Sequence, residues 1–329
     1  MNAALATTAA AAVVRDFPTA PTRGDLTLRE VCDAYMAGYN GRDDSRDRRL
    51  SFWVGVMGDV KLRDLDGDSI ADFLDALAAQ NIRKYVGRDD HDRPVFREHG
   101  RRSPATVNRY RQALSAVLTW AQHKRLTPKG WAHPVRPLRS EREDNARVRF
   151  LSADERQRLL AAARISAWPK LYLLILMALT TGARRGELLG LRHRDLDLEI
   201  KTASVATTKN GEPRVLPLTD AVVNEIKRHG SPHPDALLFP GRFRTEQPYA
   251  IEEAWRRCLR NARVRNCRFH DLRHSCASYL AQNGAGLLEI ADVLGHKSLK
   301  MTQRYSHLTV EHKAKLVRRV LGGIGGTEE

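Results

Sequence analysis

The sequence predicts a mainly helical protein with one small β-sheet, an α+β fold, divided into two domains. Three observations support this prediction. Apolar residues recur at helical spacing along most of the chain, a charged Pro- and Gly-containing stretch interrupts them at 126–147, and one Asn-Gly pair separates two strand-like segments. A length of 329 residues suits about two domains, and 42% hydrophobic with 29% charged residues is a globular composition.

The first predicted domain, residues 25–125, is helical and follows a flexible tail at 1–24. Thr27-Leu28-Arg29-Glu30 has the capping-box form that opens a helix. Ser103-Pro104 combines a capping serine with a proline at the first helical position, so another helix begins there. Two more helices are expected between these, at about 48–57 and 69–79. The polar segment 81–102 is expected to be a long loop that has room for a short hairpin.

Residues 126–147 have the composition of a flexible, basic linker, and a second domain is expected at 148–329. A capping box at Ser152–Glu155 opens its first helix. The apolar run Leu171–Leu179 predicts a buried helix and is far shorter than the roughly 20 residues that span a bilayer. A β region follows at 200–218, where Asn210-Gly211 favours a tight hairpin turn. The remaining helices are expected at about 219–229, 249–262, 271–283, 286–294, 299–305 and 309–320.

The chain is strongly basic, with 55 Lys+Arg against 39 Asp+Glu and a formal net charge of +16. Residues 101–150 alone hold 12 basic and 3 acidic side chains. A localised excess of this kind suits a phosphate polymer, although a solvated basic face has the same composition. The four cysteines form no CxxC pair, which argues against a disulfide scaffold and against a cysteine zinc site. The Ala-rich start lacks the basic region of a secretory signal.

Three short segments carry candidate chemistry. In Thr181–Glu187, a glycine turn leads into a helix that starts with Arg184, which suits either a phosphate or an ordinary helix ion pair with Glu187. In His270-Asp271-Leu272-Arg273-His274, the i, i+3 spacing places His270 and Arg273 on one helical face. His270 and His274 could also form a metal pair, but zinc proteases need Glu where this chain has Asp271.

The third segment is Leu294–Ser298, which contains His296 and is followed by Tyr305. A tyrosine is most often a packing residue. Among several cationic side chains, however, its phenolate form is favoured, so we expect a lowered pKa and a usable oxygen nucleophile.

The order of these residues resembles the tyrosine recombinase family, also called phage integrases. The residues that carry the resemblance are Arg184, Lys209, His270, Arg273, His296 and Tyr305. The amino-acid sequence of residues 270–308 is similar to that family almost throughout, and the resemblance covers about 150–310. Residues 25–125 more weakly resemble the family's helical, SAM-like core-binding domain, and the segment 81–102 is longer than the family leads us to expect.

The resemblance implies that Tyr305 attacks a phosphate of duplex DNA and forms a 3′-phosphotyrosine with a free 5′-hydroxyl. Arg184 and Arg273 would hold the non-bridging oxygens, and His296 would donate another hydrogen bond. Lys209, beside the Asn-Gly turn, would protonate the leaving 5′-oxygen. Positioned cations of this kind stabilise the charge of phosphoryl transfer.

His270 would take the tyrosine proton or orient the site. No metal and no ATP are expected, because the arginines supply positive charge and the phosphotyrosine ester conserves the energy of the cleaved bond. Consistent with this, the sequence has no Walker-type loop.

The expected partners are double-stranded DNA and further copies of the chain, as a tetramer on two duplexes, with an accessory DNA-bending protein as an option. The resemblance implies the bacterial cytoplasm, at the nucleoid. Segment 309–321 is expected either to pack on its own domain or to dock on a neighbouring protomer. Further DNA contacts are expected from basic residues of the first domain and the linker, namely Arg101, Arg102, Arg109, Arg111, Lys129, Arg136 and Arg139.

The favoured role is integration and excision of a prophage or another mobile element. A Xer-type resolvase of chromosome or plasmid dimers is the alternative within the same class, and a type IB topoisomerase shares the chemistry. Two alternatives come from other classes. One is a non-catalytic DNA-binding protein on the same fold, and the other is a zinc hydrolase built on His270 and His274.

Overall fold

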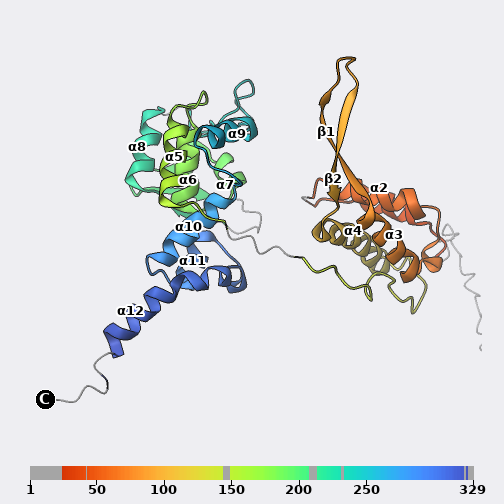
Figure 1. Ribbon diagram of the computed structural model, residues 1–329. Helices are drawn as coiled ribbons and strands as arrows, with labels where there is room; N and C mark the ends of the chain where they lie inside the picture. Colours follow the sequence, from red (N-terminus) through yellow and green to blue (C-terminus); the bar gives the residue numbers. More distant parts are fainter. Residues whose placement is uncertain are drawn as a thin grey trace, which may run out of the picture. The chain divides into compact units, whose positions relative to one another are not determined.

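The computed structural model describes residues 24–41, 43–143, 149–206, 213–230, 233–321 and 324, and it divides into two compact units, 1–145 and 146–329. Each unit is described by itself. The described residues are mostly helical and form two small antiparallel sheets (Figure 1). The predicted fold class is confirmed.

The first unit is built on four helices and one 3-10 turn: α1 (Leu28–Ala37), α2 (Arg46–Met57), η1 (Leu62–Asp64), α3 (Gly67–Ala79) and α4 (Pro104–His123). Both predicted start signals are confirmed. Thr27 and Glu30 form a complete capping box, and the Ser103 hydroxyl accepts from the backbone N–H of Thr106. Trp53 is fully buried at the centre of this unit, where its indole N–H donates to the carbonyl of Tyr110 at 2.9 Å.

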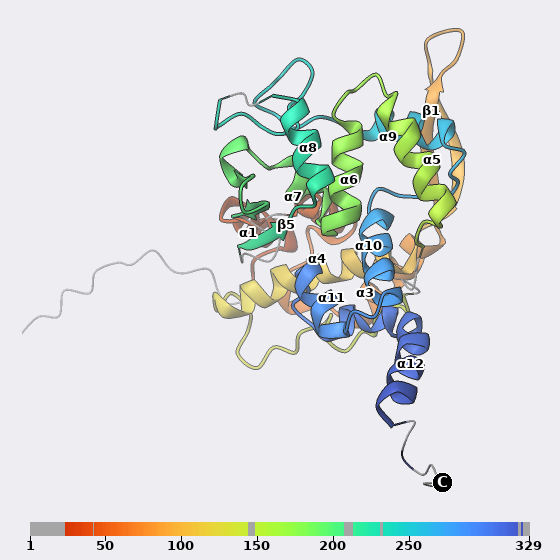
Figure 2. The same ribbon diagram turned by 90° about the vertical axis from the view of Figure 1, so that its left-hand side faces the viewer.

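A long β-hairpin joins α3 to α4. Strands β1 (Asn81–Arg88) and β2 (Pro94–Arg101) pair antiparallel over almost the whole segment that was expected to be mainly loop. The turn is fixed locally, because the Asp89 carboxylate accepts from the backbone N–H groups of His91 and Arg93, both at 2.9 Å. The hairpin extends away from the helices of its unit (Figures 1 and 2).

Residues 126–143 differ from the flexible linker that their composition predicts. Val135 is fully buried in the core of the first unit, and Trp131 and Leu138 pack against that core. The Arg111 guanidinium, on α4, donates to the carbonyl of Leu138 at 2.9 Å and to the hydroxyl of Ser140 at 2.8 Å. Apolar side chains spaced among the prolines hold this part of the segment on the helices. The remainder of the predicted linker lies outside the described residues.

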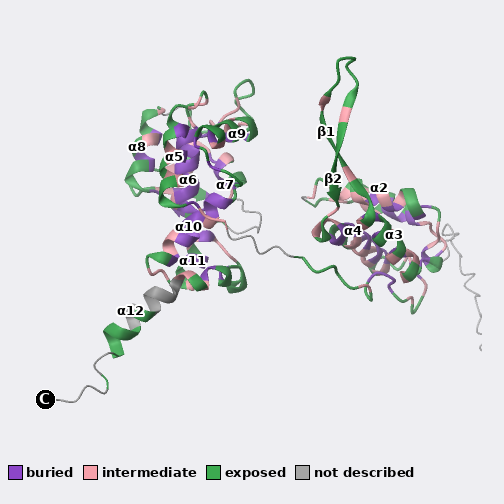
Figure 3. Ribbon diagram, viewed as in Figure 1, coloured by how far each residue is buried: buried purple, intermediate pink, exposed green. Residues whose placement is uncertain are grey.

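The second unit is built around α6 (Leu171–Thr181), whose side chains are buried almost without exception (Figure 3). This confirms the buried helix predicted from the run Leu171–Leu179. Helix α6 contacts α5, α8 and α10. The other helices of this unit are α5 (Ala153–Arg164), α7 (Arg185–Leu189), α8 (Asp220–Arg228), α9 (Glu252–Asn261), α10 (Asp271–Gln282), α11 (Leu287–Leu294) and α12 (Val310–Leu321). A short 3-10 turn, η2 (His193–Asp195), precedes the sheet.

The small sheet of this unit has the strand order β3-β4-β5, with β3 (Leu196–Asp197), β4 (Thr202–Val205) and β5 (Arg214–Pro217). Strands β4 and β5 pair antiparallel, as predicted. The turn at Asn210-Gly211 and the candidate catalytic Lys209 lie outside the described residues. Where a helix was expected at 299–305, the chain forms two 3-10 segments, η3 (Leu299–Met301) and η4 (Gln303–Thr309).

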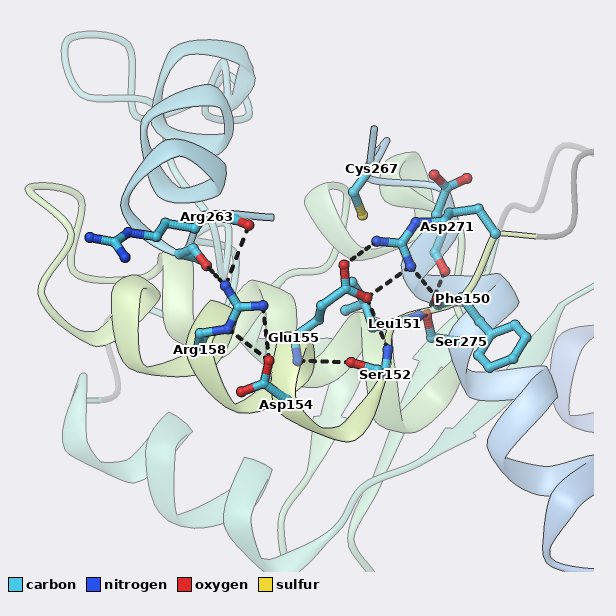
Figure 4. A network of polar contacts seen from close by, with 12 residues as sticks. Phe150, Leu151, Ser152, Asp154, Glu155, Arg158, Arg263, Cys267, Asp271 and Ser275 are labelled. Atoms are coloured by element: carbon cyan, nitrogen blue, oxygen red, sulfur yellow. Dashed lines mark hydrogen bonds and ion pairs between the residues drawn. The ribbon is translucent and has the colours of Figure 1, made fainter. Parts of the chain in front are cut away.

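A polar network ties the start of the second unit to α10 (Figure 4). Ser152 and Glu155 form the predicted capping box of α5, and the Glu155 carboxylate also pairs with Arg149. The backbone N–H of Leu151 donates to the Ser275 hydroxyl, and its carbonyl accepts from the Tyr279 hydroxyl, both at 2.9 Å. These bonds hold α10, which follows His270 and carries Arg273 and His274, against the rest of the unit.

None of the four cysteines forms a disulfide, and all four are buried. In the part of the chain that the structure describes, no helix is both long and apolar enough to cross a bilayer.

Candidate active site

The first turn of α10 places three site residues together. His270 is the residue before the helix, and Arg273 and His274 follow within it. Arg273 is only 4% exposed, and its Nη1 donates to the carbonyl of Gly182 at 2.7 Å. Burial, together with the positive charges of Arg184 and Arg214, lowers the pKa of Arg273 to about 10. A buried cation surrounded by other cations is under electrostatic stress that a bound anion would relieve.

The glycine turn of Thr181–Glu187 supplies the partner of Arg273. Gly182 ends α6 in the left-handed conformation, with φ of 61°, and a Cβ there would lie 2.4 Å from a methyl carbon of Leu294. Only glycine fits this turn without moving its neighbour. The carbonyl of Gly182 is thereby directed at Arg273.

Arg184 is the residue before α7, and its side chain is 20% exposed. Its Nη1 donates to the Glu187 carboxylate at 2.7 Å, and its backbone N–H donates to the other oxygen at 2.9 Å. The helix ion pair considered for Arg184 is therefore present. Burial alone would raise the pKa of Glu187, but the Arg184 hydrogen bonds and the charges of Arg214 and Arg184 outweigh it, so that pKa is lowered. Glu187 fixes Arg184 in the same surroundings as Arg273.

Arg214, on β5, is a third arginine of the site that sequence reasoning missed. Its Nη2 lies 3.4 Å from the Glu187 carboxylate, and its Nη1 donates to the carbonyl of Val293 at 3.4 Å. Burial and the nearby charge of Arg184 contribute to a lowered pKa. No motif spacing marks this residue, because it lies on a strand three residues beyond the Asn-Gly pair.

Tyr305 is placed beside these cations, as predicted. It lies in η4, is 1% exposed, and packs with Ala277, Ala281, Ile290 and Leu294. Its hydroxyl lies 2.6 Å from Nδ1 of His274. The sequence singled out His274 only as half of a metal pair, although its position directly after Arg273 places it on the helix turn that faces the site.

The expected lowering of the tyrosine pKa is wrong for this structure. Burial raises the pKa of Tyr305, and the opposing charges of Arg304 and Arg273 do not outweigh it. The expectation included the effect of nearby cations, which lowers the pKa, but left out the desolvation of the phenolate, which raises it. The group that can accept the phenolic proton is therefore important to the chemistry.

His296 follows the left-handed Gly295 that ends α11, and its Nδ1 lies 2.8 Å from the Thr302 hydroxyl. Burial, followed by the charges of Arg273 and Arg184, lowers its pKa to about 4. Burial and its histidine neighbour lower the pKa of His274 to about 4 as well. Burial and the charge of Arg273 also lower the pKa of His270. At neutral pH these rings are uncharged, and each can donate or accept one proton.

The predicted DNA contacts of the first unit fall into two groups. Arg102 and Arg111 are half-buried and used within the chain. Arg102 donates to Gln80 and lies over the ring of Tyr110, and Arg111 holds residues 126–143 on α4, so DNA contact by these two residues stays a prediction. The exposed members are Arg101, Arg109, Lys129, Arg136 and Arg139.

His270 and His274 lie edge to face with ring centroids 5.1 Å apart. Within the described residues, no three His, Cys, Asp or Glu side chains are grouped as metal ligands. The structure therefore offers no third ligand for the zinc alternative.

The buried histidines predict a pH-dependent stability. The folded pKa of His274 and His296 is about 4, against about 6.5 in an unfolded chain, so the unfolded state binds more protons between these values. Their contribution to stability is complete above pH 6.5 and is lost as pH falls towards 4. After a discount for partial exposure, we expect about 1–2 kcal/mol from each ring. Urea unfolding from pH 7.5 to 4.5 should show this slope, and His296→Gln should reduce it; an equal slope in both proteins would contradict the prediction.

The model of the phage integrase family matches residues 149–312. The integrase of Salmonella phage P22 is 24% identical over 323 residues, which cover 90% of this chain and 80% of that protein. The shufflon-specific DNA recombinase of Escherichia coli is 32% identical over 177 residues, but the match covers 54% of this chain and only 44% of that protein.

The tyrosine recombinase XerC of Xanthomonas campestris pv. campestris (strain B100) is 28% identical over 249 residues, with 73% of each chain covered. Among solved structures, the integrase of the Tn1549 transposon, in complex with a circular intermediate DNA, aligns with a TM-score of 0.67 at 16% identity. The alignment covers 90% of this chain and 99% of that one. At 16% sequence identity, this structural likeness shows that the two chains share a fold.

Proposed function

The chain belongs to the phage integrase family of tyrosine-type site-specific DNA recombinases, and on that premise we propose that Tyr305 cleaves duplex DNA to form a covalent 3′-phosphotyrosine. The observation that carries the proposal is the 2.6 Å contact between the Tyr305 hydroxyl and His274 beside a buried arginine cluster. Rejoining to another 5′-hydroxyl then exchanges strands. The ester conserves the energy of the broken bond, so ATP is not needed.

Arg273 and Arg184 hold the two non-bridging oxygens of the scissile phosphate. Arg273 keeps one guanidinium nitrogen, Nη2, buried without a hydrogen-bond partner among the described residues, while the other is fixed on Gly182. A planar fork anchored at one end presents its free end in a defined direction. His296 adds a hydrogen bond to the same phosphate, and Lys209 protonates the leaving 5′-oxygen.

We propose that His274 is the general base that accepts the proton of Tyr305, and that His270 orients the His274 ring. With its own proton on Nε2, the neutral His274 ring accepts the phenolic proton at Nδ1 as the Tyr305 oxygen attacks the phosphate, so that a free buried phenolate does not have to form first. Because Tyr305 is covered in this structure, the proposal includes a shift of η3 and η4 that brings its oxygen to the phosphate.

Replacing His274 with alanine is expected to slow cleavage about 10²-fold, the lower range for loss of a general base. The measurement is single-turnover cleavage of a nicked duplex at saturating protein. His270→Ala is the comparison variant, because its ring touches His274 and has no hydrogen bond to Tyr305 in the described structure. A larger loss for His270→Ala than for His274→Ala would reverse the two assignments.

The function itself is tested by a covalent adduct on a denaturing gel. The protein is incubated with a duplex labelled on either side of the cut, with and without a chelator. We expect an adduct only with the fragment that ends in a 3′-phosphate, equally strong with chelator, and attached to Tyr305 by peptide mapping. DNA binding without any adduct would instead support a non-catalytic DNA-binding protein. Activity that the chelator abolishes would support the zinc hydrolase.

We also propose that four copies act on two duplexes, with α12 docking on a neighbouring copy. Val317, Val320 and Leu321 of α12 are 55%, 63% and 49% exposed, so these apolar side chains are not packed on their own unit. Integration and excision of a mobile element is the favoured role, and direct repeats bounding the DNA that carries the gene would support it. Recombination confined to a chromosomal dimer-resolution site would favour the resolvase.

A further inference from the structure

The β1–β2 hairpin of the first unit has no packing role that accounts for its length. Its two eight-residue strands have almost no buried side chain, and both faces are open to solvent. An isolated two-stranded hairpin is marginally stable in water at best. A segment this long, and supported so little by its own unit, is more readily explained by contact with a partner.

One face of the hairpin carries an unneutralised pair of cations. Lys84 and Arg97 are directly opposite each other in the ladder, and among the described residues neither has an ion pair. Like charges opposite each other on two strands destabilise the pairing. At the tip, by contrast, Arg88 pairs with Asp92 and Arg93 pairs with Asp89. The strands therefore present unpaired positive charge, whereas both arginines of the turn are paired with its carboxylates.

The opposite face carries aromatic rings that stiffen the strands. Tyr85 and Phe96 are cross-strand partners with ring centroids 5.8 Å apart, and the Arg83 guanidinium lies 5.6 Å from the centroid of Phe96. Both rings remain about half exposed. Cross-strand aromatic pairs hold the register of a ribbon, so the two cations on the other face keep a fixed spacing.

We propose that this hairpin is a DNA-binding arm, whose Lys84 and Arg97 face contacts the phosphates of the duplex on which the chain acts. The inference rests on the proposed function for the identity of the partner. A two-stranded ribbon has the cross-section that the major groove of B-DNA admits, and strands of eight residues extend about 26 Å, which is most of a helical turn. Duplex DNA supplies the negative charge that the Lys84–Arg97 pair lacks among the described residues.

The test uses the full chain with the double substitution Lys84→Gln and Arg97→Gln. The matched control is Lys227→Gln with Arg228→Gln, which removes the same charge from the exposed end of α8. Binding to a fluorescently labelled mixed-sequence duplex of about 30 base pairs is titrated over a range of salt concentrations. Two lost phosphate contacts should weaken binding about 10–100-fold near 0.1 M salt and reduce the salt slope by about 1.8. The control should retain most of the affinity and the slope.

An unchanged slope, or an equal loss in the control, would overturn the proposal. So would normal DNA binding combined with a lost contact between protein copies, since the arm would then serve protein association. The adduct assay at saturating protein separates this question from the function. The hairpin variant should still form the Tyr305 adduct. If the unaltered chain forms no adduct while the hairpin variant still loses affinity for DNA, the proposed cleavage is refuted and the DNA-binding role of the hairpin is supported.

Discussion

Tyr305→Phe is expected to abolish the covalent protein–DNA adduct and all strand exchange, while DNA binding stays within about twofold. The substitution removes one oxygen, and no other described side chain replaces it, because His274 bonds only this hydroxyl in the site. The ring remains to fill the cluster with Ala277, Ala281, Ile290 and Leu294, so the fold is retained. Loss of a covalent nucleophile removes the reaction pathway itself, which is why the effect exceeds that of any supporting residue.

Tyr279→Phe is the matched control, because it removes a tyrosine hydroxyl from the same region. That hydroxyl donates to the carbonyl of Leu151 and has no contact with Tyr305 or His274. We expect the Tyr279 variant to form the adduct at a normal rate with a modest loss of stability, about 1 kcal/mol. A persistent adduct in Tyr305→Phe, mapped to another residue, would refute the assignment of the nucleophile.

Arg273→Met is expected to lower the single-turnover cleavage rate by about 10³-fold without lowering the melting temperature. Removing one positioned donor to a developing charge costs roughly 10²–10³ in rate. In Arg273, Nη1 is fixed on the carbonyl of Gly182, and the buried Nη2 has no hydrogen-bond partner among the described residues, which leaves it to bind the phosphate. Its lowered pKa, caused by burial and by Arg184 and Arg214, means that the folded state disfavours this charge. An apolar side chain of similar length removes that repulsion and keeps the packing.

The cleavage assay runs at saturating protein, and thermal unfolding is recorded for the same variants. Arg256→Met on the exposed face of α9 serves as the control and should change neither quantity. A lowered melting temperature together with lost activity would mean that Arg273 supports activity by stabilising the fold. The inference that its buried charge destabilises the folded state would then be wrong.

Much of the fold follows from local signals in the sequence. The capping boxes at Thr27 and Ser152 place helix starts correctly, because the side chain and the backbone groups that it satisfies are three residues apart. The site motifs on α7 and α10 are similarly local, and the structure brings Arg184, Arg273, His296 and Tyr305 into one electrostatic environment.

Features that depend on contacts between distant segments could not be predicted in this way. The burial of Val135 holds residues 126–143 on the first unit, and composition alone does not reveal it. Arg214 reaches the site from a strand, and the raised pKa of Tyr305 depends on a pocket assembled from α10, α11 and η4. In each case the deciding term is desolvation or tertiary packing, which a local pattern does not contain.

Tyr305, the proposed nucleophile, is carried on 3-10 backbone rather than on an α-helix. Such turns have poorer hydrogen-bond geometry, so displacing them costs less than unwinding a regular helix of the same length. Under the function proposed above, the covered hydroxyl of Tyr305 makes a shift of η3 and η4 a precondition of strand cleavage.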